Sequence, residues 1–148
     1  MTATLQQALL APDIQPQVVT DCQTLIEQQV AGMSGISGST VKLAYKTVHA
    51  VAPGHVTYLI ETLLPRMTEE LEPYWSDFGT SGGAEFGDYL AKRGDEVAEA
   101  LLSVTDARAA ASGRPTIIKA YRTVRGHATK HVVAALPQVG AMVQQYVA

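Results

Sequence analysis

Residues 40–48 read Thr-Val-Lys-Leu-Ala-Tyr-Lys-Thr-Val, and residues 116–124 read Thr-Ile-Ile-Lys-Ala-Tyr-Arg-Thr-Val. The offset is 76 residues, and the correspondence extends to the pairs Ala52/Ala128, His55/His131 and Val56/Val132. Between residues 40–56 and 116–132, 8 of 17 positions are identical. Unrelated sequences of this composition would share about 1 position in 17, so a fixed-offset similarity of this strength is typical of internal duplication. The sequence therefore predicts a chain built from two related halves.

Apolar residues in each half recur three and four positions apart, which is the spacing of one face of an α-helix. The stripes cover residues 18–33, 41–51 and 56–71 in the first half and 97–111, 117–124 and 132–146 in the second. No stretch alternates with period two over the length of a strand. We therefore predict an all-α protein, a helical bundle built from two duplicated three-helix halves stacked about a pseudo-twofold axis.

Glycine and proline mark the expected boundaries within a single domain covering residues 1–148. The repeat halves are expected at about residues 13–75 and 84–148, joined by a Gly/Ser-rich linker at about 76–83. Pro53-Gly54 is expected to end the first repeated helix, and Gly126 the second. Pro65 and Pro137 are expected to kink or break their helices, because proline removes a backbone hydrogen bond. The sequence alone does not decide whether these kinks open a cavity.

The composition is that of a globular protein and includes a single cysteine. The chain has 148 residues, of which 47% are hydrophobic and 17% charged, as in a globular protein. Its one cysteine, Cys22, lies on an apolar helix face and permits no internal disulfide, which favours a reducing compartment. The N-terminus lacks the pattern of a signal peptide, and the longest uncharged stretch, residues 132–148, is too short for a membrane span. We expect a cytoplasmic protein.

The charge is unevenly distributed along the chain. All 14 acidic residues lie at or before Asp106, where 5 Lys or Arg leave a net charge of −9. From Ala107 onward there are 6 Lys or Arg and no acid, giving +6. Such asymmetry indicates either a polyanionic partner or attraction between the two halves. We favour attraction between the halves, within one molecule or between two, because the whole chain is acidic.

Four residues stand out as candidate ligand contacts because the repeat pairs them: Tyr45 with Tyr121, and His55 with His131. Two pseudo-symmetric phenols could line a shared pocket, although core tyrosines with hydrogen-bonded hydroxyls are the simpler interpretation. His127 and His131 have the spacing of two metal ligands on one helix, but no further ligand motif accompanies them. We predict no metal, no cofactor and no catalytic residues, since nucleophile-elbow and phosphate-loop motifs are missing from the sequence.

A basic series forms the strongest case for nucleic-acid binding: Lys119, Arg122, Arg125 and Lys130. Clustered positive charge is what phosphate binding needs. However, no recognition-helix signature and no interleaved aromatic residues accompany it. We therefore favour a solvated basic face, or one that pairs with the acidic segment, over nucleic acid.

Three features of the sequence resemble a family of small uncharacterised bacterial helical proteins. They are the Ala-Tyr-Lys-Thr-Val helix, the segment at residues 95–108, and the closing helix after Lys130-His131-Val132. The resemblance covers most of the chain and implies an all-helical cytoplasmic protein. It brings no activity, ligand or catalytic residue.

Two functions remain open. The first is a non-enzymatic helical scaffold or protein-interaction module that self-associates, in the simplest case as a homodimer. The second is a carrier or sensor of a small apolar ligand, with a pocket between the two halves contacted by Tyr45, Tyr121, His55 and His131.

Overall fold

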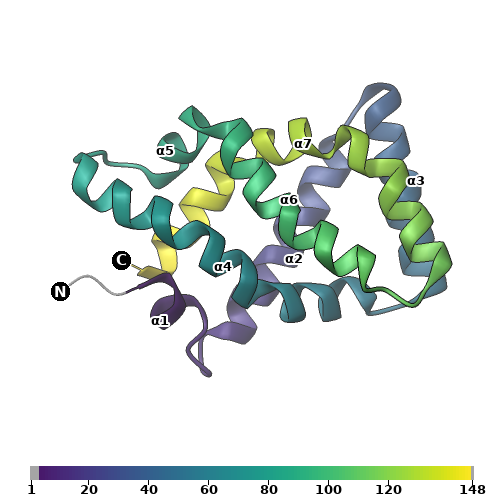
Figure 1. Ribbon diagram of the computed structural model, residues 1–148, viewed down its shortest axis with the longest axis horizontal. Helices are drawn as coiled ribbons and strands as arrows, with labels where there is room; N and C mark the ends of the chain where they lie inside the picture. The colour runs from purple at the N-terminus through teal and green to yellow at the C-terminus, as the bar shows by residue number, and fades with distance from the viewer. Residues whose placement is uncertain (1–3, 148) are drawn as a thin grey trace.

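The computed structural model of the chain describes residues 4–147 (Figure 1). Over this range it is built from α-helices and contains no strand, which confirms the all-α prediction. The helices are α1 (Leu5–Leu9), α2 (Gln15–Gly32), α3 (Gly35–Val51), α4 (His55–Ser81), α5 (Phe86–Lys92), α6 (Gly94–Ala110) and α7 (Pro115–Val147). None of the helices in this range is both long and apolar enough to cross a membrane.

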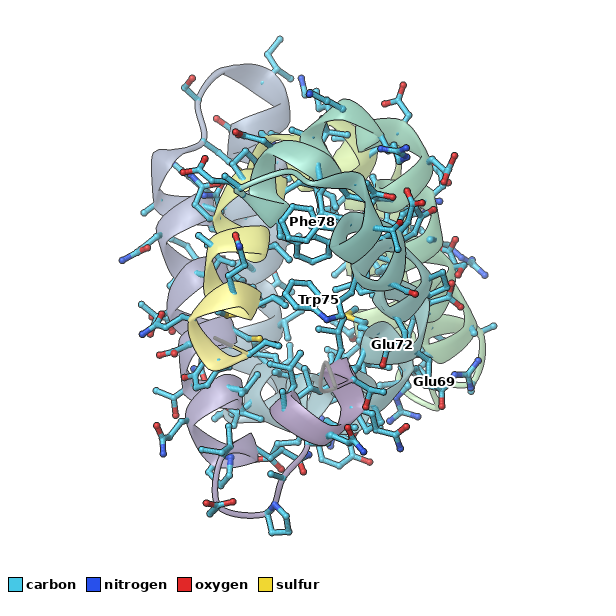
Figure 2. The ribbon with its side chains drawn as sticks, turned by 90° about the vertical axis from the view of Figure 1, so that its left-hand side faces the viewer. Glu69, Glu72, Trp75 and Phe78 are labelled. Carbon is cyan, nitrogen blue, oxygen red and sulfur yellow. The ribbon has the colours of Figure 1, made fainter. Side chains whose placement is uncertain are left out.

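An aromatic cluster between α4 and α5 forms part of the core. It gathers the single tryptophan and both phenylalanines of the chain. Trp75 of α4 points into the interior (Figure 2), and its ring centroid lies 5.0 Å from that of Phe86, which is fully buried. Phe78 lies 5.3 Å from the same ring. One turn earlier on α4, the Glu72 carboxylate accepts a hydrogen bond of 2.9 Å from the Leu5 amide, which attaches α1 to α4.

The two repeated stretches lie in α3 and in the first half of α7, and these helices pack side by side in opposite directions (Figure 1). This end of the molecule is more thinly packed than the aromatic end. The buried apolar core includes side chains of α1, α2, α4, α5, α6 and α7 but none of those described in α3.

The expected linker is largely helical. Helix α4 continues to Ser81, and the chain leaves the helix at Gly82, whose φ of 77° is one that glycine adopts without strain. Phe78 extends the buried stripe of α4 past the start of the Gly/Ser-rich stretch, so packing keeps those residues helical. Pro65 does not end α4 either, because its neighbours Leu64 and Thr68 are buried and their packing offsets the lost backbone hydrogen bond.

Gly126 was expected to end the second repeated helix, and this prediction is wrong. Helix α7 runs without interruption from Pro115 to Val147, through both Gly126 and Pro137, and bends along its course (Figure 1). The first copy breaks at Pro53-Gly54, whereas the residues 76 positions later are Thr129-Lys130, which can remain helical. One repeated stretch thus forms a helix–turn–helix and the other a single long helix.

Candidate functional site

A pocket of about 630 Å³ lies where the α3–α4 turn meets the α6–α7 turn. These turns lie together at the lower right of Figure 1, at the opposite end of the molecule from both chain termini. The first half of the chain supplies one wall and the second half supplies the other. The lining residues are Val51, Ala52, Pro53, Gly54, His55, Tyr58, Arg108, Ala111, Ser112, Gly113 and Arg114.

The α3–α4 turn is fixed by its sequence. Ala52 is buried at 7% exposure and anchors the turn against the protein. Pro53 cannot donate the hydrogen bond that would continue α3. Gly54 has a φ of 80°, a left-handed conformation that favours glycine. His55 then opens α4, and its amide donates to the Ala52 carbonyl over 3.0 Å.

The α6–α7 turn carries the second wall. Helix α6 ends at Ala110, and the Ser112 hydroxyl accepts a hydrogen bond of 3.2 Å from the Arg114 amide. Pro115 begins α7, where its fixed φ suits the first helical position and its missing N–H leaves no intrahelical bond unmade. The turn therefore holds Arg114 beside the pocket.

The pocket contains two arginines and no carboxylate. Within residues 4–147 neither Arg108 nor Arg114 forms an ion pair. Asp106 lies only two positions before Arg108, but its carboxylate accepts a 2.8 Å hydrogen bond from Nε of Arg125 and another bond from the Tyr121 hydroxyl. Asp106 therefore pairs with α7, and the pocket lining carries two positive charges without an acidic residue.

His55 and Tyr58 form the part of the wall between these arginines. Their ring centroids are 6.0 Å apart with an interplanar angle of 29°, and the Arg108 guanidinium carbon lies 5.8 Å from the Tyr58 ring centroid. Burial, followed by the positive charges of Arg114 and Arg108, lowers the pKa of His55 below its ordinary value.

Two long helices begin at the pocket, α4 at His55 and α7 at Pro115. The first amides of an α-helix have no intrahelical acceptor, and the helix dipole places about half a positive charge there. No side chain caps the start of α4. These partial charges add to those of Arg108 and Arg114, so the pocket is suited to an anion.

Of the four candidate ligand residues, only His55 lines this pocket. The hydroxyl of Tyr121 lies 2.7 Å from that of Thr105 and donates to Asp106. Burial, together with Asp106, raises the pKa of Tyr121 to about 12. Tyr121 therefore joins α6 to α7 by hydrogen bonds, which is a structural role.

Tyr45 differs from Tyr121 because its surroundings differ. The residues that correspond to Thr105 and Asp106 in the first half are Gln29 and Val30. The Tyr45 hydroxyl is buried and has no hydrogen-bond partner among the described residues, while its ring meets His49 edge-on at 4.5 Å. Burial, then the charge of Glu27, raises the pKa of Tyr45.

His131 also has a buried ring nitrogen, Nε2, without a partner in the described part of the chain. Its pKa is lowered by burial and then by the nearby Lys130 and His127. It lies outside the pocket lining. Across residues 4–147, no three His, Cys, Asp or Glu side chains lie together as metal ligands would.

The four residues of the basic series have different surroundings in the structure. Arg125 is half-buried and pairs with Asp106 at 2.8 Å and with Glu99 at 3.2 Å, both on α6. The remaining members, Lys119, Arg122 and Lys130, are exposed on α7. At least part of the charge asymmetry thus appears as attraction between α6 and α7 within the molecule.

Sequence reasoning missed three residues of the pocket, Tyr58, Arg108 and Arg114. In the structure Asp106 pairs with Arg125, whereas Arg108, two positions later, lines the pocket. One sequence feature could have indicated the pocket. Both helix-breaking pairs, Pro53-Gly54 and Ser112-Gly113, have basic or aromatic residues close by. Their offset is not 76, so the repeat did not pair them.

Comparison with known proteins gives one match. A family model described as "Family of unknown function (DUF6918)" matches residues 5–147, nearly the whole chain. No curated protein and no solved structure matches. The match therefore provides a family but no activity.

Proposed function

The chain belongs to this family of unknown function, and we propose that it binds a small ligand with an oxyanion head group in the pocket between the two turns. The observation that carries the proposal is the pair of arginines, Arg108 and Arg114, that line the pocket without an acidic partner among the described residues. Two guanidinium groups and two helix N-termini sum to a charge of about +3. This charge favours a phosphate dianion over a singly charged carboxylate.

The proposed role is binding, as in a carrier or sensor, rather than catalysis. Arginine suits this role because its planar fork donates two parallel hydrogen bonds to oxyanions. The pocket is lined by residues of the segments 51–58 and 108–114, and this lining supports the proposal of a small-ligand carrier. Its charge changes the expected ligand from a purely apolar molecule to one with an anionic head.

Titration of ¹⁵N-labelled protein with inorganic phosphate, at constant ionic strength, tests the proposal. We expect saturable amide shifts at residues 52–58 and 111–118. The double variant Arg108→Gln/Arg114→Gln should bind phosphate at least tenfold more weakly, because each hydrogen bond to a charged group contributes about 1.5–3 kcal/mol. Its matched control is Arg122→Gln, which removes an exposed arginine outside the pocket lining. Equal phosphate binding by the double variant and the control would refute the proposal.

We also propose that the protein self-associates through α3, because two large apolar side chains are strongly exposed on this helix. Ile36 is 88% exposed and Leu43 is 67% exposed, seven positions apart and therefore on one face. Thr40 and Thr47 lie between and beside them, and each donates its hydroxyl to the helix carbonyl four residues earlier. The helix therefore presents an apolar pair, with the exposed Lys46 beside Leu43, that a second copy could cover.

The proposed duplication supplies a conservative test of self-association. Position 43 corresponds to Lys119 in the second copy, so we expect Leu43→Lys to fold normally. Sedimentation velocity over a concentration series should detect a dimer for the natural chain and a monomer for Leu43→Lys. A monomer for both proteins up to about millimolar concentration would exclude self-association.

We propose a cytoplasmic location as well, supported by a single cysteine, Cys22, that cannot form an internal disulfide. Fractionation of the source cells, with antibody detection, tests this location. Recovery in an extracytoplasmic fraction would contradict it.

A further inference from the structure

We infer that the ligand of this pocket carries a planar aromatic body next to its phosphate head. The inference rests on the proposed function, since it specifies the rest of a molecule whose head group the arginines hold. Three properties of the pocket lead to it: its volume, the separation of its polar and apolar walls, and the exposed ring of Tyr58.

The pocket is much larger than a phosphate ion. Its volume is about 630 Å³. A water molecule takes up about 30 Å³ in the liquid, so an ion of five heavy atoms fills only a small part of this space. Pockets of about 300–1,000 Å³ are typical of sites for whole small molecules. The occupant therefore has a body as well as a head.

The two walls differ in chemistry. Both arginines, Arg108 and Arg114, belong to the α6–α7 side, whereas the α3–α4 side supplies the larger apolar side chains, Val51, Pro53 and Tyr58, beside His55 and the start of α4. A ligand with its phosphate on the arginines would thus place its body against the α3–α4 turn. The proposed ligand is therefore anionic at the end near α6 and α7 and apolar at the end near the α3–α4 turn.

Tyr58 indicates that the body is aromatic. Its side chain is 51% exposed although it lines a pocket, and Val51 beside the same turn is 50% exposed. The ring already has His55 stacked at 6.0 Å and the Arg108 guanidinium at 5.8 Å. A planar ring bound here would stack on Tyr58 while its phosphate reached the guanidinium groups, and it would cover apolar surface that water now contacts.

Three probes of graded chemistry test the inference by NMR titration: inorganic phosphate, phenyl phosphate and n-hexyl phosphate. We expect phenyl phosphate to bind about tenfold more tightly than inorganic phosphate, and also more tightly than hexyl phosphate, because an aromatic pair adds stabilisation beyond its buried area. In Tyr58→Leu, which keeps an apolar side chain without a ring, phenyl phosphate should lose its advantage over hexyl phosphate, with both affinities measured on the same variant. Tyr58→Phe is the matched control and should retain the preference.

The outcomes separate this inference from the proposed function. If inorganic phosphate binds but phenyl phosphate binds no more tightly, the aromatic body is refuted and the anion site stands. Preference for hexyl over phenyl phosphate, or an unchanged preference for phenyl phosphate in Tyr58→Leu, also refutes it. If none of the three probes binds, the proposed function itself fails.

Discussion

Replacing Gly140 by alanine should destabilise the protein because α5 lies directly on this glycine. A Cβ added at Gly140 would stand 2.2 Å from the amide nitrogen of Gly87 and 2.3 Å from its Cα. These are backbone atoms, so no side-chain rotation relieves the overlap, and α5 must move away from α7. Phe86 and Leu90, both at 0% exposure, would move with it.

The magnitude follows from two opposing contributions. Glycine to alanine inside a helix normally stabilises by about 0.5–1 kcal/mol. Overpacking of a closely packed core costs about 1–3 kcal/mol. Since the overlap here is with backbone, we take the upper end of the overpacking cost, about 3 kcal/mol. Subtracting the gain in helix propensity of about 1 kcal/mol leaves an expected net loss of stability of about 2 kcal/mol for Gly140→Ala. Gly126→Ala is the matched control on the same helix, where the added Cβ meets nothing within 4 Å, so that variant should be stabilised.

Urea denaturation followed by the fluorescence of Trp75, the only tryptophan, measures both variants. With a denaturant slope of about 1–3 kcal/mol/M, a loss of 2 kcal/mol lowers the midpoint by about 1 M. The Gly126→Ala midpoint should rise slightly. If Gly140→Ala is as stable as Gly126→Ala, α5 does not contact α7 at this position and the packing argument is wrong.

Three further predictions concern titratable groups. Arg125→Gln removes the ion pairs to α6, and because its partners are partly exposed we expect a loss of at most about 1 kcal/mol, which added salt should reduce in a denaturation series. The lowered pKa of Asp106 should make its contribution to stability disappear as pH falls below about 4, and this acid sensitivity should be smaller in Arg125→Gln, which keeps only the hydrogen bond from Tyr121. Burial lowers the pKa values of His55 and His131, so the unfolded chain binds more protons than the folded chain. The free energy of unfolding should therefore fall as pH drops below about 6.5. His131→Gln should reduce this dependence on pH. Burial raises the pKa of Cys22 to about 11, so iodoacetamide should alkylate native protein far more slowly at pH 8 than protein in urea; equal rates would contradict its packing against the core.

Local pattern in the sequence was sufficient for the fold class. The three- and four-residue spacing of apolar residues gave helices throughout, and the Pro53-Gly54 break was placed correctly between α3 and α4. These features are local, since a helix forms from contacts within a few residues and Pro-Gly blocks it wherever it occurs.

Helix continuity depended instead on packing. Gly126, Pro65 and the first residues of the expected linker are breaking signals, yet α4 and α7 continue through all of them. Buried neighbours such as Phe78 offset the local cost, and their partners lie on other helices. A prediction from neighbouring residues in the sequence does not include this packing energy.

The pocket was decided by tertiary structure alone. The sequence determined that Arg108 follows Asp106 by two positions, and that both repeated stretches carry a tyrosine and a histidine. Only the folded chain brings Arg125 of α7 onto Asp106, and only it sets the α6–α7 turn, with Arg108, against the α3–α4 turn. The physical reason is that an ion pair and a pocket wall depend on distance in space, and the two sides of this pocket are supplied by residues of the segments 51–58 and 108–114, which are far apart in the chain.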